Sequence, residues 1–402
     1  MIAPLTRSII TAFSGFCVAG CATAPDPTRV DVATSDQIVS AQDVSPGLKP
    51  YYQRIHMEGI SNATLNRMRL ASAAIEAGEW QAAARALDEV LRDVEALGPA
   101  DPRSREALSH FESEEIKRFK GETHERAMAY LLRGLLYMRE KQWDDARACF
   151  KSVQVHDAAK RDPALRANWA SAWWLEGWCN RSLGEKSAAR ECWERSEKCL
   201  PSARPLPRPA PSDNALCVAL LGYAPLKMPT GDYGERLSYR PAESKAAAIS
   251  LRTGGRPRPI PLGEDMLAQA SSRGLRHMDE VNEAKADGRF ATQTAGEILT
   301  TGGLGATIGG LVEEDREVAA IGLGVMAAGM TTRAVASTLQ PKADTRTWDL
   351  LPATIHILPL TLSGEETQLE FQIQDARGAR VALRKVEVAG SSNAGLILLV
   401  ER

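Results

Sequence analysis

The sequence predicts an α+β protein in which an N-terminal helical repeat domain precedes a C-terminal domain with a small antiparallel β-sheet. Three observations support this fold class. Residues 51–200 carry apolar residues at helical spacing, and two stretches there repeat one pattern. Residues 353–402 contain four short extended runs separated by turn residues. Between these regions, glycine-rich apolar stretches within residues 295–338 predict a tight helical hairpin.

The first twenty residues have the features of a secretory signal. Basic Arg7 precedes an apolar run over residues 9–18, which is too short to span a membrane. The order Val18-Ala19-Gly20-Cys21 resembles a bacterial lipoprotein lipobox, in which small residues precede the cut and the next cysteine carries diacylglycerol. We therefore expect that residues 1–20 are removed and that Cys21 carries a lipid that includes palmitate. The alternative is an ordinary signal peptide cut near Ala24.

The residues after Cys21 predict a location and a tether. Ala22 stands where an aspartate would favour retention in the inner membrane, so we expect the mature protein on the periplasmic side of the outer membrane. Several acyl chains anchor a protein far more firmly than one, because each buried CH₂ contributes about 0.8 kcal/mol. The stretch over residues 22–50 is rich in Pro, Asp, Ser and Thr and has no apolar period, so residues 21–50 are expected to form a tether.

The balance of charge and the cysteine content bear on the possible partners of the chain and on its disulfide bonds. The chain has 49 basic and 51 acidic residues, a balance that gives no reason to expect nucleic acid as a partner. After loss of Cys17 and lipidation of Cys21, three cysteines fall within helical patterns and are expected in the core: Cys149, Cys179 and Cys192. The remaining two, Cys199 and Cys217, could pair in an oxidising compartment, although an odd total leaves at least one thiol free.

Two stretches define the repeat: "AYLLRGLLYMREKQWDDARACFKSV" (129–153) and "SAWWLEGWCNRSLGEKSAARECWERS" (171–196). Each has an aromatic residue, a glycine four positions later, and an alanine followed by an aromatic in the second half. This pattern resembles the tetratricopeptide repeat (TPR), in which the small residues let two helices approach and the aromatics fill the space between them. An earlier unit, residues 70–91, keeps only the second half. Residues 51–200 are therefore predicted to form a TPR-like helical domain.

In the resembled repeats, set positions of the first helix line a concave groove. The residues at those positions that we predict to bind a partner are Met128, Leu131, Leu135, Met138, Trp174, Trp178 and Arg181. Trp174 and Trp178 are four residues apart and share one helical face. The alternative interpretation is that another part of this chain covers the groove.

The C-terminal half begins after a linker predicted at residues 201–219, which is rich in Pro and Arg at its start. The α+β domain is expected to span residues 220–402. Its first part, 220–241, is loop-rich with short extended pieces, and a strand at 246–252 and a helix at 264–288 follow. The four C-terminal runs, at 353–362, 367–375, 380–388 and 395–402, predict a small antiparallel sheet or sandwich, to which 246–252 could add a fifth strand.

Small residues recur at helix-packing spacing within the predicted hairpin. Gly305 and Gly309 form a G-x-x-x-G, and Gly324 and Ala328 form a second small pair. Small residues at this spacing let two helices pack backbone to backbone. A buried or self-packed hairpin is the favoured interpretation, because neither arm offers about 20 clean apolar residues. Membrane insertion or an oligomer contact is the alternative.

Three segments resemble an uncharacterised family of bacterial TPR-containing outer-membrane lipoproteins: "FKGETHERAMAYLLRGLLYMREKQWDDARACF" (119–150), "LAQASSRGLRHMDEVNEAKA" (267–286) and "ADTRTWDLLPATIHI" (343–357). Genes of this family often neighbour those of lipoproteins similar to the curli-secretion channel and to penicillin-binding-protein activators, which implies assembly work at the outer membrane. Members tend to have Arg-Gly-Gly-Arg where this chain has Arg273-Gly-Leu-Arg276. The resemblance implies a location and an architecture, and no reaction.

No enzymatic signature is present in the sequence. Six histidines are scattered without H-x-x-x-H spacing, and no G-x-S-x-G occurs, so we expect no enzyme, no cofactor and no metal site. The charged and aromatic members of the resembled segments are Arg273, Arg276, Asp344, Arg346 and Trp348, for which a buried ion-pair network is favoured over a recognition patch. The predicted function is a lipid-anchored, periplasm-facing scaffold that binds envelope proteins through its groove. The alternative is an oligomerising or membrane-inserting component of an export complex.

Overall fold

The computed structural model describes residues 26–96, 118–157, 168–200, 205–252, 257–271, 343–362, 368–388 and 395–402, with six single residues between 294 and 328. The predicted signal peptide, Cys21 and the glycine-rich hairpin at 295–338 lie outside these ranges, apart from single hairpin residues. So does most of the helix predicted at 264–288. None of the helices that the structure describes is long and apolar enough to cross a membrane.

The folded part begins well before the end of the predicted tether. Helix α1 (Val32–Ser40) lies within residues 26–50, and helix α2 (Lys49–Glu58) starts there. The Asp31 carboxylate caps α1 by accepting a hydrogen bond from the Thr34 N–H, and a proline occupies the first turn of α2. The tether prediction is therefore wrong for residues 26–50, because local capping and contacts with later residues order a stretch that has little apolar periodicity.

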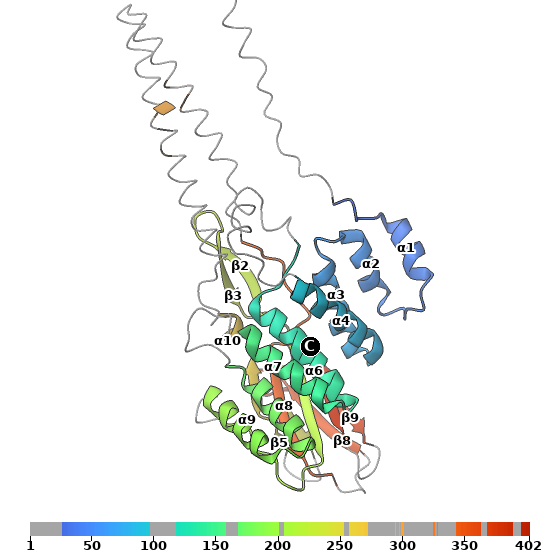
Figure 1. The fold of residues 1–402 in the computed structure, drawn as a ribbon, viewed down its shortest axis with the longest axis vertical. Coiled ribbons are helices and arrows are strands. Elements are labelled where there is room, and N and C mark those ends of the chain that lie inside the picture. Colours follow the sequence, from blue (N-terminus) through green and yellow to red (C-terminus); the bar gives the residue numbers. More distant parts are fainter. Residues whose placement is uncertain are drawn as a thin grey trace, which may run out of the picture.

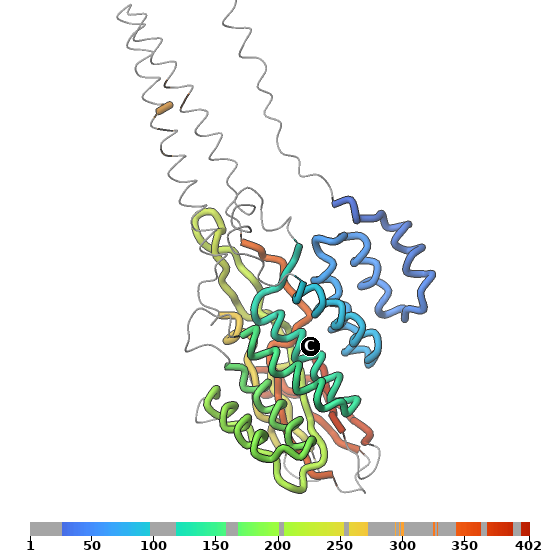
Figure 2. Tube along the Cα trace, in the orientation of Figure 1, coloured from blue at the N-terminus to red at the C-terminus, as the bar shows by residue number. Residues whose placement is uncertain are grey.

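The following helices form three antiparallel pairs that pack in sequence order (Figures 1 and 2). The pairs are α3 (Ala63–Glu76) with α4 (Trp80–Ala96), α6 (Thr123–Arg139) with α7 (Trp143–Asp157), and α8 (Ala170–Ser182) with α9 (Lys186–Cys199). This arrangement confirms the predicted helical repeats. The first pair, whose sequence pattern is degenerate, is complete in the structure as α3 and α4.

In each pair, the first helix has a small residue, and the second helix has a bulky residue sixteen positions later in the sequence. A Cβ atom at Gly134 would lie 2.7 Å from the Phe150 ring, and one at Gly177 would lie 2.5 Å from the indole of Trp193. In the first pair, Ala71 and Leu87 hold these positions, and both are fully buried. The smaller Leu87 leaves room for the methyl group of Ala71, which explains why that unit lacks the glycine and the aromatic.

The turn inside each pair has a residue with positive φ two positions before the second helix. These residues are Gly78 (φ 74°), Lys141 (φ 60°) and Gly184 (φ 85°). Glycine adopts this backbone conformation at no steric cost, whereas a lysine does so at a cost of about 1 kcal/mol. The three turns therefore have one geometry, although the sequence of the middle turn does not show it.

Two four-stranded sheets form the β part. The first, which we call the inner sheet, has the order β10-β1-β7-β6 and the second, the outer sheet, has the order β5-β4-β8-β9. The inner strands are β1 (Ala215–Leu221), β6 (Leu262–Asp265), β7 (Thr354–Leu360) and β10 (Leu396–Glu401). The outer strands are β4 (Ala248–Arg252), β5 (Arg258–Pro259), β8 (Gln368–Gln374) and β9 (Arg380–Glu387). All predicted strands are present, in two stacked sheets.

The inner sheet differs from the prediction in two ways. Strand β1 begins inside the stretch predicted as a linker at 201–219 and runs to Leu221, and all seven of its residues are buried. Strand β10 pairs with β1 in parallel, with Val218 opposite Leu398, while β7 pairs antiparallel, with Val218 opposite Ile357. A central strand that is covered on both faces carries a continuous apolar run rather than alternation, so it lacks the period-2 signal.

Three layers result: helices, inner sheet and outer sheet. Alternate residues of β1 point to opposite faces. Leu216, Val218 and Leu220 belong to the hydrophobic cluster shared with the helices. Cys217 and its alternate neighbours belong to the cluster between the sheets, together with Phe371. The helical and β parts thus share one core along the whole of β1.

Two further elements complete the fold. The hairpin of β2 (Leu226–Thr230) and β3 (Arg236–Arg240) fits the prediction of short extended pieces at 220–241. Helix α10 (Met266–Ser271) starts the helix predicted at 264–288, although residues 264 and 265 still belong to β6. The last residue, Arg402, lies beside the helices, with its Nε 3.3 Å from the Glu76 carboxylate.

Candidate functional site

The predicted partner-binding residues lie on two neighbouring first helices, α6 and α8. Six of the seven are no more than 7 % exposed: Met128, Leu131, Leu135, Met138, Trp174 and Trp178. Only Arg181 is half-buried. The sequence pattern therefore placed these residues correctly on one inner face, but that face is closed in the structure.

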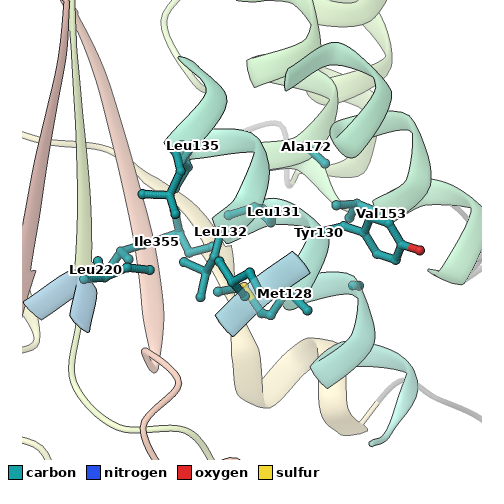
Figure 3. Close-up of a cluster of buried hydrophobic side chains, with 14 of the residues drawn as sticks. Met128, Tyr130, Leu131, Leu132, Leu135, Val153, Ala172, Leu220 and Ile355 are labelled. Carbon is teal, nitrogen blue, oxygen red and sulfur yellow. The ribbon is translucent and has the colours of Figure 1, made fainter. Parts of the chain in front are cut away.

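The inner sheet fills the groove. Figure 3 shows Leu132 and Leu135 of α6 pointing toward the strands, from which Leu220 and Ile355 point back. All four side chains belong to one buried cluster, in which they are no more than 3 % exposed. Of the two interpretations of the apolar groove, the structure supports the one in which the chain covers its own groove. A groove open over its whole length is contradicted by this burial.

The predicted linker also closes one edge of the groove. The indole N–H of Trp174 donates to the carbonyl of Pro207, at 3.0 Å. Arg181 Nη2 donates to the carbonyls of Pro211 and Asp213, at 3.1 and 2.8 Å. The proline-rich segment therefore runs along α8 and leads directly into β1. It does not separate two domains.

One part of the groove stays open. A cavity of about 320 Å³ lies where the ends of α6 and α8 meet the inner sheet. It is lined by Met138, Lys141, Trp143, Trp178, Arg181, Ser182, Asp213, Asn214, Leu216, Gly395 and Leu396. Three of the predicted partner-binding residues are among them. We call this cavity the groove mouth.

Charge at the groove mouth is positive. The guanidinium of Arg181 lies 5.2 Å from the centre of the Trp178 ring, and Lys141 is exposed beside them. The one carboxylate in the lining, that of Asp213, accepts hydrogen bonds from Ala210 N and Thr361 Oγ1, at 2.7 and 2.8 Å. These bonds hold the Asp213 carboxylate in place, and because two cations face this single carboxylate, the lining keeps a net positive charge beside its aromatic walls. It suits an anionic group next to an apolar side chain.

A second cluster, which we call the junction, joins the helices to the segment over residues 343–351. Lys227 Nζ lies 2.8 Å from Glu125 Oε2 and donates to the carbonyl of Arg346 at 2.7 Å. The other oxygen of Glu125 accepts the Trp348 N–H at 2.8 Å. Burial alone would raise the pKa of Glu125, but the Lys227 and His124 charges outweigh it and lower that pKa.

Arg346 and Trp348 extend the junction to α3. Arg346 makes a two-pronged contact with Asp344 and donates to the Ser61 carbonyl and to Asn62 Oδ1. The Trp348 indole N–H donates to Ser72 Oγ at 2.9 Å. Of the predicted network, Asp344 and Arg346 form one partly buried ion pair and Trp348 joins them through hydrogen bonds, whereas Arg273 and Arg276 lie outside the described residues. Lys227 could not be predicted, because it lies in a hairpin strand with no motif around it.

Two further titratable groups, Glu264 and His356, are buried outside the junction. Burial raises the pKa of Glu264 to about 7, although Gln269 and Ser171 donate hydrogen bonds to it. His356 has a lowered pKa because it is buried, and its Nδ1 lies 3.0 Å from the Ile260 carbonyl. Within the part of the chain that the structure describes, no group of three or more His, Cys, Asp or Glu could hold a metal ion.

Cys199 and Cys217, for which a disulfide was one possibility, are not bonded to each other. Cys149, Cys179 and Cys192 are buried as predicted. Burial raises the pKa of Cys149, Cys192 and Cys199 to about 12. Thiols with such pKa values are hardly ionised at neutral pH and are poor nucleophiles.

Comparison with known protein families supports the repeat. Residues 128–156 match the tetratricopeptide repeat, which corresponds to most of α6 and nearly all of α7. This match suggests that the chain interacts with other proteins. Searches of curated proteins and of solved structures gave no match.

Proposed function

We propose that this chain is a lipid-anchored scaffold on the periplasmic side of the outer membrane, where it binds protein partners during cell-envelope assembly. The tetratricopeptide match at residues 128–156 supports a role in protein interaction. The sequence around Cys21 and the resemblance to envelope lipoproteins support the anchor and the location. No catalytic role is part of this proposal.

The groove mouth is the observation that carries the proposed partner site. It keeps Met138, Trp178 and Arg181 at the surface of a cavity, although the rest of the predicted groove is filled. Aromatic and arginine side chains are the residue types that contribute most to protein interfaces. We propose that a partner inserts an apolar side chain and a neighbouring carboxylate here, facing Trp143, Lys141 and Arg181.

Capture of partners from the envelope by chemical cross-linking tests this site. Lys141→Gln and Trp143→Ala change the lining, and Trp173→Ala is the matched control. Trp143 and Trp173 are both half-buried tryptophans on repeat helices, but Trp173 lies outside the cavity and contacts Arg195. We expect the two lining variants to lose the same cross-linked protein, while the control retains it. Equal capture by all three variants would refute the groove mouth as the partner site.

The anchor has its own test. Cys21→Ala should abolish incorporation of labelled palmitate, because the thiol that carries the lipid is gone. Equal labelling of the variant and the natural protein would rule out lipidation at Cys21.

The second candidate function is oligomerisation or membrane insertion through the glycine-rich hairpin. The G-x-x-x-G of Gly305 and Gly309 favours it, because small residues at that spacing allow close helix contacts. A Cys21→Ser protein separates the candidates. A monomer that is extracted without detergent fits the scaffold, whereas persistent membrane association fits the hairpin.

A further inference from the structure

The start of the described chain is held firmly against the loop between α2 and α3. The Asp26 carboxylate accepts hydrogen bonds from Ser61 N and Ser61 Oγ, at 3.1 and 3.0 Å. Thr28 Oγ1 accepts the Ile60 N–H at 2.7 Å, and the Val30 N–H donates to the His56 carbonyl at 3.2 Å. Hydrogen bonds from Thr28 and Ser61 also lower the pKa of Asp26, so its charge is kept. The described chain is thus held to the fold from Asp26 onward.

This anchoring point lies very close in sequence to Cys21. Five residue steps separate the two, and an extended chain covers about 3.6 Å per step, so the fold begins within about 18 Å of the lipidated residue. A tether running to residue 50 would have allowed a separation on the order of 100 Å. The short connection keeps the surface around Asp26 next to the membrane.

Exposed apolar side chains occur in this part of the chain. Nine large apolar side chains are exposed among the described residues, and three of them lie between residues 32 and 60. These are Val32, Met57 and Ile60, which are 58, 38 and 40 % exposed. Ile60 is bound through its backbone to Thr28, and Met57 adjoins His56, which is bound to Val30. Ile60 and Met57 therefore belong to the segment on which the start of the described chain is held, and Val32 follows two residues after Val30.

We propose that Val32, Met57 and Ile60 form a membrane-facing surface that rests on the phospholipid layer in which the Cys21 lipid is inserted. This inference rests on the proposed lipid anchor and adds an orientation to it. Apolar side chains near the surface gain contact with the acyl boundary. The exposed side chain of Arg29 lies in the same segment, where its Nε donates to the Glu58 carbonyl at 3.1 Å and leaves its terminal guanidinium nitrogens for phosphate groups. Strands β8 and β9 of the outer sheet lie away from α1 and α2 (Figure 1), so they then face away from the membrane.

Photo-cross-linking of the full lipidated chain tests this orientation. Benzoylphenylalanine is placed at Met57 or Ile60, and at Val381 or Leu383 of β9 as matched controls. The control side chains are 43 and 37 % exposed, close to the values of the test positions, but they lie on the outer sheet. Each protein is reconstituted into vesicles of phosphatidylethanolamine and phosphatidylglycerol that contain a tritiated phospholipid. We expect at least fivefold more tritium on the protein at positions 57 and 60 than at 381 and 383.

Two results would overturn the membrane-facing surface. One is equal tritium at all four positions, and the other is cross-linking of positions 57 and 60 to protein instead of lipid. Palmitate incorporation, measured on the same preparations, separates this failure from failure of the anchor. Palmitate present without lipid adducts at 57 and 60 refutes the orientation alone. Absence of palmitate from the natural protein refutes the anchor and the orientation with it.

Discussion

Lys227 Nζ lies 2.8 Å from Glu125 Oε2, and both side chains are almost completely removed from water. The pair joins a hairpin strand to the first turn of α6. Each partner has further hydrogen bonds, Lys227 to the Arg346 carbonyl and Glu125 from the Trp348 N–H. A buried ion pair is stable only when its remaining donors and acceptors are satisfied in this way. The junction therefore fixes where the 343–351 segment sits on the helices.

Loss of Lys227 should destabilise the protein strongly. Lys227→Met leaves the Glu125 carboxylate buried without its countercharge, which costs about 3–5 kcal/mol of unfolding free energy. Urea unfolding measures this loss. The double variant Lys227→Met/Glu125→Gln should be more stable than the single variant, because no unpaired charge remains. A loss below about 1 kcal/mol in the single variant would contradict the buried pair.

The buried Glu264 should make stability depend on pH. Its pKa in the folded state is about 7, above the 4.5 of an exposed glutamate. The folded state therefore binds more protons between these values, so the unfolding free energy falls as pH rises from about 4.5 to 7 and is level above that. Because His356 is buried with a lowered pKa, its contribution has the opposite slope below pH 6.5.

Comparison with Glu264→Gln isolates this effect, since the contribution of His356 is common to both proteins. Urea unfolding at several pH values should show the natural protein losing stability relative to the variant between pH 4.5 and 7. Parallel pH profiles for the two proteins would show that Glu264 titrates normally.

The repeat pairs should tolerate a methyl group only where the opposite residue is small. Gly134→Ala places a Cβ about 2.7 Å from the Phe150 ring, so about 1–3 kcal/mol of stability should be lost. Phe150→Leu in the same chain should restore part of it, since Ala71 and Leu87 form this combination in the first pair. A double-mutant cycle measures the coupling. Additivity of the two single changes would mean that these residues do not touch.

Local sequence patterns were sufficient to predict most of the helices and strands. They were insufficient where contacts between residues far apart in the sequence determine the structure. The helix pairs and the C-terminal strands carry periodic apolar residues, so they could be predicted. Strand β1 is buried on both faces, has no alternation and follows a proline-rich segment, which made it resemble a linker. Residues 26–31 are ordered by hydrogen bonds to residues 56–61, and such partners are not visible in a local window.

The candidate site could be predicted only in part, because local patterns do not show which segments meet in the fold. Spacing placed Leu131 and Trp174 on the inner face of the repeats, where the structure has them. Whether an apolar inner face meets solvent, a partner or the same chain depends on what the rest of the chain offers. Here Val218 and its alternate neighbours in β1 supply the matching apolar face. Lys141 and Asp213 of the groove mouth follow no motif, so only the fold brings them together.

The central claim is that the chain fills its own groove, and oxidative footprinting of methionines tests it most directly. Met128 of the filled part of the groove is 0 % exposed, whereas Met57 and Met228 are 38 and 37 % exposed and serve as internal controls. Native Cys21→Ser protein is treated briefly with hydroxyl radicals, and sulfoxide is quantified for each methionine by peptide mass spectrometry. The filled groove predicts that Met57 and Met228 oxidise at least tenfold faster than Met128. Comparable oxidation of all three methionines would contradict it.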